Sequence, residues 1–181
     1  MAHQLVVAIE VAKGPLHVLR KVDTAGVATL PIAELEPLLK LREGEPYVDE
    51  RIGAVGAALG EYYRVRGFAN VRVAPDVVIG GTAENGRVPV DVAFRIVEGA
   101  RSIVRQVRID GAVAIAPAEL AAQLGLVAGK PFYRPQHVLD REILERRYRN
   151  AGFQRATVTT QVTPIDGSDG VELVYTVIEG P

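Results

Sequence analysis

Residues 44–68 read GEPYVDERIGAVGAALGEYYRVRGF, and residues 129–153 repeat their frame as GKPFYRPQHVLDREILERRYRNAGF. The spacing is constant, because Gly44 and Phe68 both return 85 positions later, as Gly129 and Phe153. Four further anchors keep this offset: Pro46, Tyr63, Arg64 and Gly67 return as Pro131, Tyr148, Arg149 and Gly152. A fixed period over a stretch of this length indicates that one structural unit occurs twice.

Each copy predicts a long helix that starts after a Gly-x-Pro turn. In the first copy apolar residues recur at steps of three and four, which places them on one helix face: Val48, Ile52, Val55, Leu59 and Tyr62 or Tyr63. The second copy predicts a less regular stripe of Leu139, Ile143, Leu144 and Tyr148. Gly67 and Gly152 suit the left-handed residue that ends a helix, and the phenylalanine after each is placed to fold back on the last turn.

Alternating apolar residues predict three similar strands, each followed by a turn. They run from Leu5 to Val11, from Val90 to Ile96 and from Val171 to Val177. Three such closing strands accompany only two long helices, so we expect the first to be the last strand of a preceding repeat. The chain would then be a piece of a longer array, with Met1 and Ala2 outside its natural sequence.

The other segments complete each unit in the order opening strand, short helix, long helix, middle strand, closing strand. Opening strands are predicted at 16–22 and 103–109, short helices at 32–41 and 117–126, and middle strands at 69–79 and 155–163. Pro37 predicts that the first short helix begins near this proline or is kinked there. The middle and closing strands should form an antiparallel hairpin, while the opening strand needs a crossover and can lie parallel to one of them.

The predicted fold class is α+β. Each unit is expected to be a three-stranded mixed sheet covered on one face by two helices, because alternation leaves one sheet face for solvent. The predicted domains are residues 1–14 (terminal strand of a preceding repeat), 15–99 (first complete repeat) and 100–181 (second complete repeat).

Composition excludes several classes of protein. Apolar residues make up 48% of the chain and charged residues 24%, which is typical of a folding sequence. The net charge of −1 argues against a nucleic-acid partner, since a basic face would be expected. The sequence has no cysteine, no apolar run of the roughly 20 residues that a spanning helix needs, and no signal-peptide pattern at its start.

Candidate catalytic and metal-binding residues are few. His3, His17 and His137 lack the companion ligands and spacings of a zinc site, so we expect no metal. No nucleophile elbow, P-loop or dinucleotide fingerprint is present. The helix glycines Gly53, Gly56 and Gly60 are interpreted as small faces that let the helix sit close to its neighbours. Asp140 and Glu142 are interpreted as early helix carboxylates that complement the dipole.

The element order and its anchors resemble the POTRA (polypeptide-transport-associated) domains of the BamA/TamA family of outer-membrane assembly factors. The anchors are Gly-x-Pro-aromatic before the long helix, Tyr63 or Tyr148 near its end, the Gly-Phe pair that follows, and the closing Glu-Gly-Pro at 179–181. The resemblance covers essentially the whole chain. Departures are Pro37, and Lys13 and Ala100 in place of the usual Glu and Pro of the closing motif.

The resemblance implies a periplasmic array tethered to the outer membrane through a C-terminal β-barrel that lies outside this sequence. It implies unfolded outer-membrane proteins, outer-membrane assembly lipoproteins or periplasmic chaperones, and the chain's own barrel as partners. The family offers no catalytic residues to transfer, so neither enzyme activity nor a cofactor is expected.

If the closing strand is central, as in the family, the middle strands are sheet edges that an extended client segment can join by β-strand addition. The candidate binding residues are Val71, Val73 and Val77 in the first copy, and Ala156, Val158, Thr160 and Val162 in the second.

Two alternatives stay open. The repeats could act as a structural spacer whose junction, residues 97–102, sets the geometry of the array. They could also be the POTRA region of a secretion transporter or of a barrel-linked enzyme such as a lipase. Ten-residue alternating segments after Pro181 would indicate an outer-membrane barrel.

Overall fold

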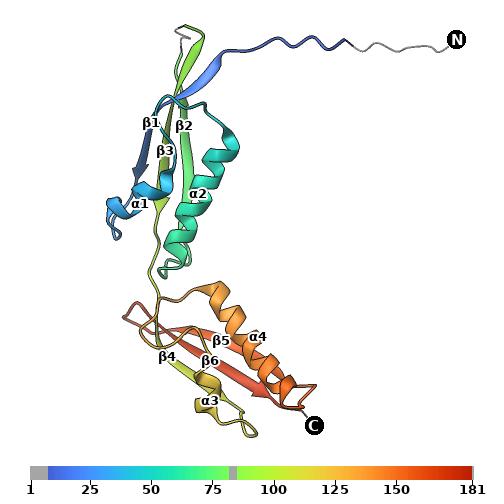
Figure 1. The fold of residues 1–181 in the computed structure, drawn as a ribbon. Coiled ribbons are helices and arrows are strands. Elements are labelled where there is room, and N and C mark those ends of the chain that lie inside the picture. Colours follow the sequence, from blue (N-terminus) through green and yellow to red (C-terminus); the bar gives the residue numbers. More distant parts are fainter. Residues whose placement is uncertain (1–7, 82–84, 181) are drawn as a thin grey trace, which may run out of the picture.

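The computed structural model describes residues 8–81 and 85–180 and contains two β-α-α-β-β repeats, one after the other (Figure 1). The first repeat comprises β1 (Leu16–Ala25), α1 (Ile32–Leu39), α2 (Asp49–Arg64), β2 (Arg72–Ile79) and β3 (Arg87–Val97). The second comprises β4 (Ile103–Asp110), α3 (Pro117–Ala121), α4 (Arg134–Asn150), β5 (Thr157–Pro164) and β6 (Gly170–Ile178). The predicted α+β class and element order are confirmed.

Each repeat has a three-stranded mixed sheet with its closing strand in the centre. The strand orders are β1-β3-β2 and β4-β6-β5. The opening strand pairs parallel to the central strand, and the middle strand pairs antiparallel to it. Register shifts follow Leu19 in β1 and Val104 in β4, so even this irregularity keeps the 85-residue offset.

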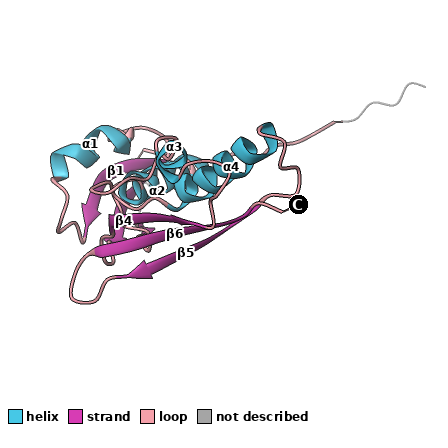
Figure 2. Cartoon of the chain, turned by 90° about the horizontal axis from the view of Figure 1, so that it is seen from below, coloured by secondary structure: helices cyan, strands magenta, loops and turns pink. Residues whose placement is uncertain are grey.

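The long helix and the short helix cover one face of each sheet, as Figure 2 shows for α3 and α4. Alternate residues of the central strand point to this face and are buried: Val90, Val92, Phe94 and Ile96 in β3, and Val171, Leu173, Tyr175 and Val177 in β6. The buried residues form two separate apolar clusters, one for each repeat. Each repeat therefore has its own core.

The Gly-x-Pro segments run along the first half of each opening strand. Gly44 donates its backbone N–H to the Leu19 carbonyl (2.7 Å), and the Leu19 N–H donates to Glu45 (2.8 Å). The second repeat makes the matching pair between Gly129, Val104 and Lys130 (both 2.8 Å). The motif thus places a short length of chain beside an edge that would otherwise be open.

The tyrosine near the end of each long helix is tied to the glutamate that follows the central strand. The Tyr63 hydroxyl donates to Oε1 of Glu98 (3.1 Å), and Tyr148 donates to Glu179 (3.0 Å). Burial and the bond to Glu179 raise the pKa of Tyr148 to about 12. These glutamates also accept backbone N–H groups of the loop after the opening strand, from Ala28 and Thr29 or from Val113 and Ala114.

The Gly-Phe pairs close the long helices as predicted. Gly67 has a φ of 97° and Gly152 a φ of 101°, both in the left-handed region that favours glycine. Phe68 and Phe153 donate their backbone N–H to the carbonyls of Tyr63 and Tyr148 (3.2 and 3.1 Å), the pattern of a Schellman ending. Their rings pack edge-on against the same tyrosines, at centroid distances of 5.4 and 5.8 Å.

Both short helices differ from their predicted extents. α1 starts at Ile32 and contains Pro37, so the expectation that it begins near this proline is wrong. In so short a helix the missing N–H removes a single i→i−4 bond. α3 ends at Ala121, because the backbone N–H groups of Gly125 and Leu126 donate to the Asp140 carboxylate (2.8 and 2.9 Å) instead of extending the helix.

The predicted inward stripe of α4 is partly wrong. Leu144 and Tyr148 are buried, but Leu139 is 50% exposed. His137 and Asp140 occupy the inward positions instead, at 7% and 0% exposure. Asp140 is therefore a core residue with hydrogen-bonded partners and not a carboxylate that complements the dipole. The interpretation failed because polar residues were left out of the apolar stripe.

The strand expected before the first complete repeat is not found over residues 8–15, which belong to no strand. Ile9 and Val11 are 83% and 74% exposed, and a strand needs a ladder partner that these residues lack within the described chain. Leu5 and Val7 lie outside the described residues. The assignment of residues 1–14 to a preceding repeat stays a prediction.

Candidate functional site

The middle strands β2 and β5 are sheet edges, because each pairs with a central strand on one side only. The opening strands are edges too, but their first halves are covered by the Gly-x-Pro segments. β2 and β5 therefore carry the candidate site, since an edge strand presents N–H and C=O groups that a further strand can pair with.

Alternate residues of an antiparallel edge strand turn their backbone groups outward. The Gly80 N–H donates to the Pro89 carbonyl (2.8 Å), so the even-numbered residues of β2 pair with β3 and the odd-numbered ones face outward. The outward N–H groups of β2 belong to Val73, Val77 and Ile79. Pro75 also faces outward, where its missing N–H leaves the ladder intact.

In β5 the bond from Ile165 to Gly170 (2.9 Å) makes the even-numbered residues face outward. They are Val158, Thr160, Val162 and Pro164, and the last has no N–H to offer.

The residues predicted from sequence lie at these edges. Val73 and Val77 lie in β2 and Val71 just before it, and all three are half-buried against the first core. Ala156 precedes β5 and is buried, as is Val158. Val162 is half-buried, and Thr160 is exposed. The structure thus brings the backbone of each set to one edge, while most of the side chains face the helix layer.

A groove of about 460 Å³ lies between β2 and α2 in the first repeat. It is lined by Gly53, Gly56, Ala57, Gly60 and Arg64 of α2 and by Val71, Arg72, Val73 and Pro75. The helix side of the groove is thus formed largely by residues with little or no side chain.

The three groove glycines are not required by the fold. A Cβ at Gly53 would meet no atom within 4 Å, and one at Gly56 would lie 3.7 Å from the Phe94 ring, an ordinary contact. At Gly60 the nearest atom would be the flexible end of Arg64. The interpretation that these glycines let the helix sit close to its neighbours is therefore wrong at Gly53. Glycine inside a helix costs roughly 1 kcal/mol relative to alanine, so the chain keeps an open groove at a cost in stability.

The second repeat has larger side chains at the equivalent helix positions. At the 85-residue offset Gly53, Gly56 and Gly60 become Val138, Arg141 and Glu145. Oε1 of Glu145 accepts the outward N–H of Val158 (3.3 Å), and its Oε2 lies 3.7 Å from the Arg149 guanidinium. The edge of β5 thus has an acceptor from its own helix.

The counterpart of Val158 in the first repeat is Val73, which lies opposite Gly60. No acceptor for the Val73 N–H occurs among the described residues. Glu145 was missed by sequence reasoning, although the Gly60/Glu145 difference is visible when the two copies are aligned.

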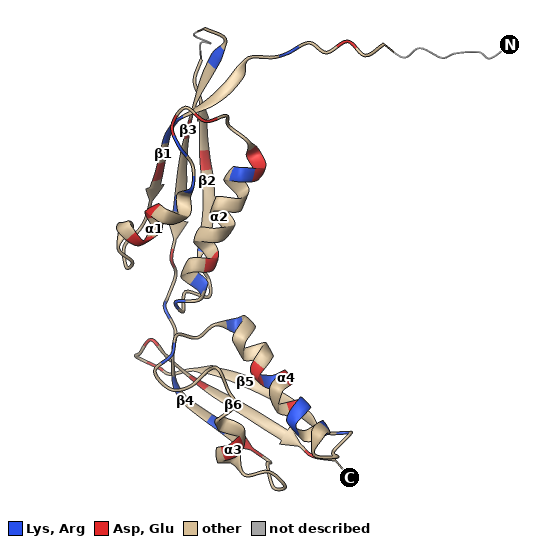
Figure 3. Cartoon of the chain, viewed as in Figure 1, with Lys and Arg blue, Asp and Glu red and all other residues tan. Residues whose placement is uncertain are grey.

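Charge also distinguishes the two long helices. α2 carries no charged residue from Ile52 to Gly60, whereas α4 carries charges along its length (Figure 3). At the start of β2 the groove is cationic, because Arg64 and Arg72 line it. Arg64 is paired with Glu61 (3.0 Å), and no ion pair of Arg72 occurs within residues 8–81 and 85–180.

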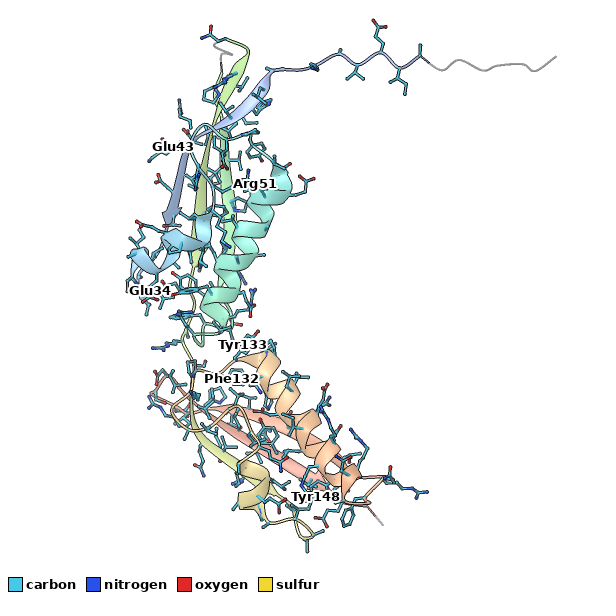
Figure 4. The ribbon with its side chains drawn as sticks, in the orientation of Figure 1. Glu34, Glu43, Arg51, Phe132, Tyr133 and Tyr148 are labelled. Carbon is cyan, nitrogen blue, oxygen red and sulfur yellow. The ribbon has the colours of Figure 1, made fainter. Side chains whose placement is uncertain are left out.

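The junction between the repeats is held by three hydrogen bonds. The Tyr133 hydroxyl, at the start of α4 (Figure 4), donates to Oε1 of Glu61 at the end of α2 (2.5 Å). The Ser102 N–H donates to the Gly67 carbonyl (2.9 Å), and Nε of Arg101 donates to Arg66 (3.0 Å). The bond from Tyr133 is the main cause that lowers the pKa of Glu61. These bonds join the end of one long helix to the start of the next repeat.

The described residues hold neither a metal-binding cluster nor a membrane-spanning helix. Within residues 8–81 and 85–180 no three His, Cys, Asp or Glu side chains are grouped so that they could hold a metal ion. Among the helices described, none combines the length and apolar character needed to cross a membrane.

Comparisons with known proteins agree with this architecture. No curated protein matches the chain. Among solved structures, BamA POTRA3-5 of Haemophilus influenzae matches with a TM-score of 0.62 at 18% identity, over 94% of this chain and 70% of that one. BamA of Haemophilus ducreyi lacking POTRA domains 1-3 matches with a TM-score of 0.59 at 21% identity, over 92% of this chain and 29% of that one. The N-terminal domain of Omp85 from Thermosynechococcus elongatus matches with a TM-score of 0.52 at 16% identity, over 93% of this chain and 65% of that one.

These likenesses show a shared fold. The family model for POTRA, described as "Surface antigen variable number repeat", matches residues 17–99 and again residues 102–180. The two matches coincide with the two helix-backed sheets and together span most of the chain. The chain therefore belongs to the POTRA family and carries two of its domains in tandem.

Proposed function

We propose that this chain is part of the periplasmic region of an outer-membrane protein assembly or insertion factor of the BamA or Omp85 type. In this proposal its sheet edges bind extended segments of unfolded outer-membrane proteins by β-strand addition. The observation that carries the proposal is the outward-facing backbone of β2, with N–H groups at Val73, Val77 and Ile79 that have no partner in the described chain. Family membership and the fold shared with BamA POTRA regions support it.

Backbone pairing suits a receiver of varied clients, because every client residue except proline offers an N–H and a C=O. Each bond contributes only about 0.5–1.5 kcal/mol net, and a disordered segment loses conformational entropy when it is ordered. We therefore expect weak, reversible binding, which allows a client to be passed on to the barrel.

The same proposal includes the wider context. The chain is tethered to the outer membrane through a C-terminal β-barrel, and outer-membrane assembly lipoproteins or periplasmic chaperones are further partners. We place the repeat boundaries at 15–99 and 100–181, which the bonds at Gly67, Arg101 and Ser102 support as a junction.

A peptide titration followed by amide NMR tests the function. A ten-residue peptide that alternates apolar residues with threonine should shift the amide signals of the middle strands. The matched control is the same peptide N-methylated at its apolar residues, whose N–H groups face the edge strand when the apolar side chains lie on the helix side. It cannot donate to that edge and should shift nothing. Shifts confined to other segments, or none at millimolar peptide, would refute strand addition.

A structural spacer is the second candidate function, favoured by the bonds across the junction. If the junction sets the geometry of the array, Tyr133→Phe should broaden the distribution of distances between spin labels placed in α1 and α3. An unchanged distribution would count against the spacer. A secretion transporter or barrel-linked enzyme is the remaining alternative, and the sequence that follows the second repeat in the full-length protein separates it from an assembly factor.

A further inference from the structure

The edges of the two sheets differ in one respect that bears on client binding. In the second repeat the outward N–H of Val158 is bound by Glu145, so part of that edge already has an occupant. In the first repeat the position of Glu145 is Gly60, and the equivalent N–H of Val73 faces the open groove. The second repeat therefore shows which group binds at this edge position. It is an oxygen atom that accepts the N–H and reaches it from the side of the long helix.

β2 and β5 are equally long, so the contact with Glu145 sets the difference in free donors between the two edges. Apart from Val158, the outward N–H groups of β5 belong to Thr160 and Val162, and they end at Pro164. The first edge offers Val73, Val77 and Ile79, interrupted at Pro75. An added strand thus finds three free donors at β2 and two at β5, and at β2 it also meets the groove that Gly53, Gly56 and Gly60 leave open.

Resting on the function proposed above, we propose that strand addition is confined to β2 of the first repeat and that Glu145 blocks the equivalent site on β5. The favoured client segment places bulky apolar side chains over Gly56 and Gly60, and it carries an acidic residue at the end next to Arg64 and Arg72. It runs antiparallel to β2, the more stable pairing, so that its C-terminal end lies at Arg72.

The chemistry of the groove selects this occupant. The helix wall of small residues leaves room for aromatic or branched side chains, whose burial drives association. The charged residues that line the groove are both arginines, and no acidic side chain lines it. A carboxylate at that end gains a partner in Arg72, which has no ion pair within residues 8–81 and 85–180.

The test exchanges the groove residue between the repeats. Gly60→Glu installs the residue of the second repeat, with Arg64 placed as Arg149 is, and Glu145→Ala removes the block from β5. The probe is a ten-residue peptide that alternates phenylalanine with threonine and ends in aspartate. The unaltered chain should show amide shifts at Val73 and Val77 and none in β5. Gly60→Glu should weaken binding about tenfold or more, and Glu145→Ala should create new shifts at Val158 and Thr160.

Two matched controls separate charge and folding from the groove itself. Ala58→Glu adds the same charge to the other side of α2, where a different groove lies, and should leave binding unchanged. Glu142→Ala removes a carboxylate from α4 that makes no hydrogen bond in the described chain and should not open β5. A chain that keeps its β3 and β6 amide signals has folded, so a loss of binding in such a variant belongs to the groove.

The peptide sequence tests the predicted occupant. Moving the aspartate to the N-terminus, or replacing it with lysine, should weaken binding about two- to fivefold, the range of an exposed ion pair. Equal or tighter binding of either peptide would overturn the assigned orientation and charge.

Failure of this inference is distinguishable from failure of the proposed function. Equal shifts in β2 and β5 of the unaltered chain would refute the confinement to β2 but keep strand addition. Unaltered binding by Gly60→Glu would refute the role of the groove. No shift in either middle strand with any peptide would refute strand addition itself.

Discussion

The helices α2 and α4 occupy the same place in two copies of one fold, but α2 is rich in small and apolar residues and α4 is rich in polar and charged ones. α2 has an apolar inner face and a groove-side surface of glycine and alanine. α4 has His137 and Asp140 in its inner face and charged side chains on the groove side. The anchors common to both helices are those that the fold needs, since Tyr63 and Tyr148 make the same bonds. Where the helices differ, the difference concerns the sheet edge and the polarity of the core.

The largest loss of stability is expected from substitutions at turn glycines that the two copies share. Gly26 and Gly111 have φ values of 84° and 75°, and a Cβ would lie 2.2 and 2.3 Å from the carbonyl oxygens of Ile96 and Val177. Alanine at either position should destabilise its own repeat by about 3 kcal/mol or more, through strain and overpacking.

Urea unfolding followed by amide NMR signals of each sheet measures these effects. Gly14→Ala is the matched control, because a Cβ there meets nothing within 4 Å. A small effect at Gly26 or Gly111 would mean that the shared frame is less constrained than the structure indicates.

The next largest loss of stability is expected at Glu98 and Glu179, the glutamates that follow the two central strands. Glu98 is 9% exposed and accepts the N–H groups of Ala28 and Thr29 together with the Tyr63 hydroxyl. Glu98→Ala should cost about 2–3 kcal/mol, because these donors lose a buried charged acceptor. Glu98→Gln keeps one acceptor oxygen and should cost less. Glu179→Ala should cost less than Glu98→Ala, since Glu179 is more exposed. The reverse order in urea unfolding would contradict this account.

The stability of the second repeat should depend on pH through His137, whose counterpart in the first core is Ile52. Burial lowers the pKa of His137. The nearby Asp140 carboxylate raises this pKa and offsets part of the shift, whereas the charges of Arg141 and Arg134 lower it further. A lowered folded-state pKa means that the unfolded chain binds the proton first. The second repeat should therefore keep its stability above the ordinary histidine pKa of about 6.5 and lose up to about 1.4 kcal/mol per pH unit below it.

His137→Ile, which copies Ile52, should remove this part of the pH dependence. Unfolding midpoints of the second repeat at pH 7.5 and 5.5 measure it, and the same slope in both chains would contradict the assignment to His137.

The smallest effect concerns the groove glycines. Gly53→Ala should stabilise the first repeat by about 1 kcal/mol, because alanine loses less backbone entropy in a helix and meets no neighbour at this site. A shift of the urea midpoint at an unchanged m-value would show it. Destabilisation would mean that Gly53 has a packing role that the structure does not show.

Much of the fold could be predicted because its anchors are local and occur twice. The 85-residue offset defined the unit, the Gly-Phe pairs located the ends of the long helices, and the alternating apolar residues located the central strands. The inner face of α4 was wrong at His137 and Asp140, since a polar core residue is recognisable only once its partners at Gly125 and Leu126 are known. Both edge strands were predicted, but the difference between them, an outward N–H that is bound in β5 and, within the described residues, free in β2, was not. It depends on a contact between Glu145 and Val158 that only the packing of helix against sheet creates.

Amide hydrogen exchange at Val73 and Val158 tests the central claim most directly. In the free chain the Val158 N–H should exchange more slowly than that of Val73, because Glu145 accepts it. Saturating peptide should slow exchange at Val73 and leave Val158 unchanged. Equal exchange in the free chain, or new protection at Val158 with none at Val73, would contradict the account.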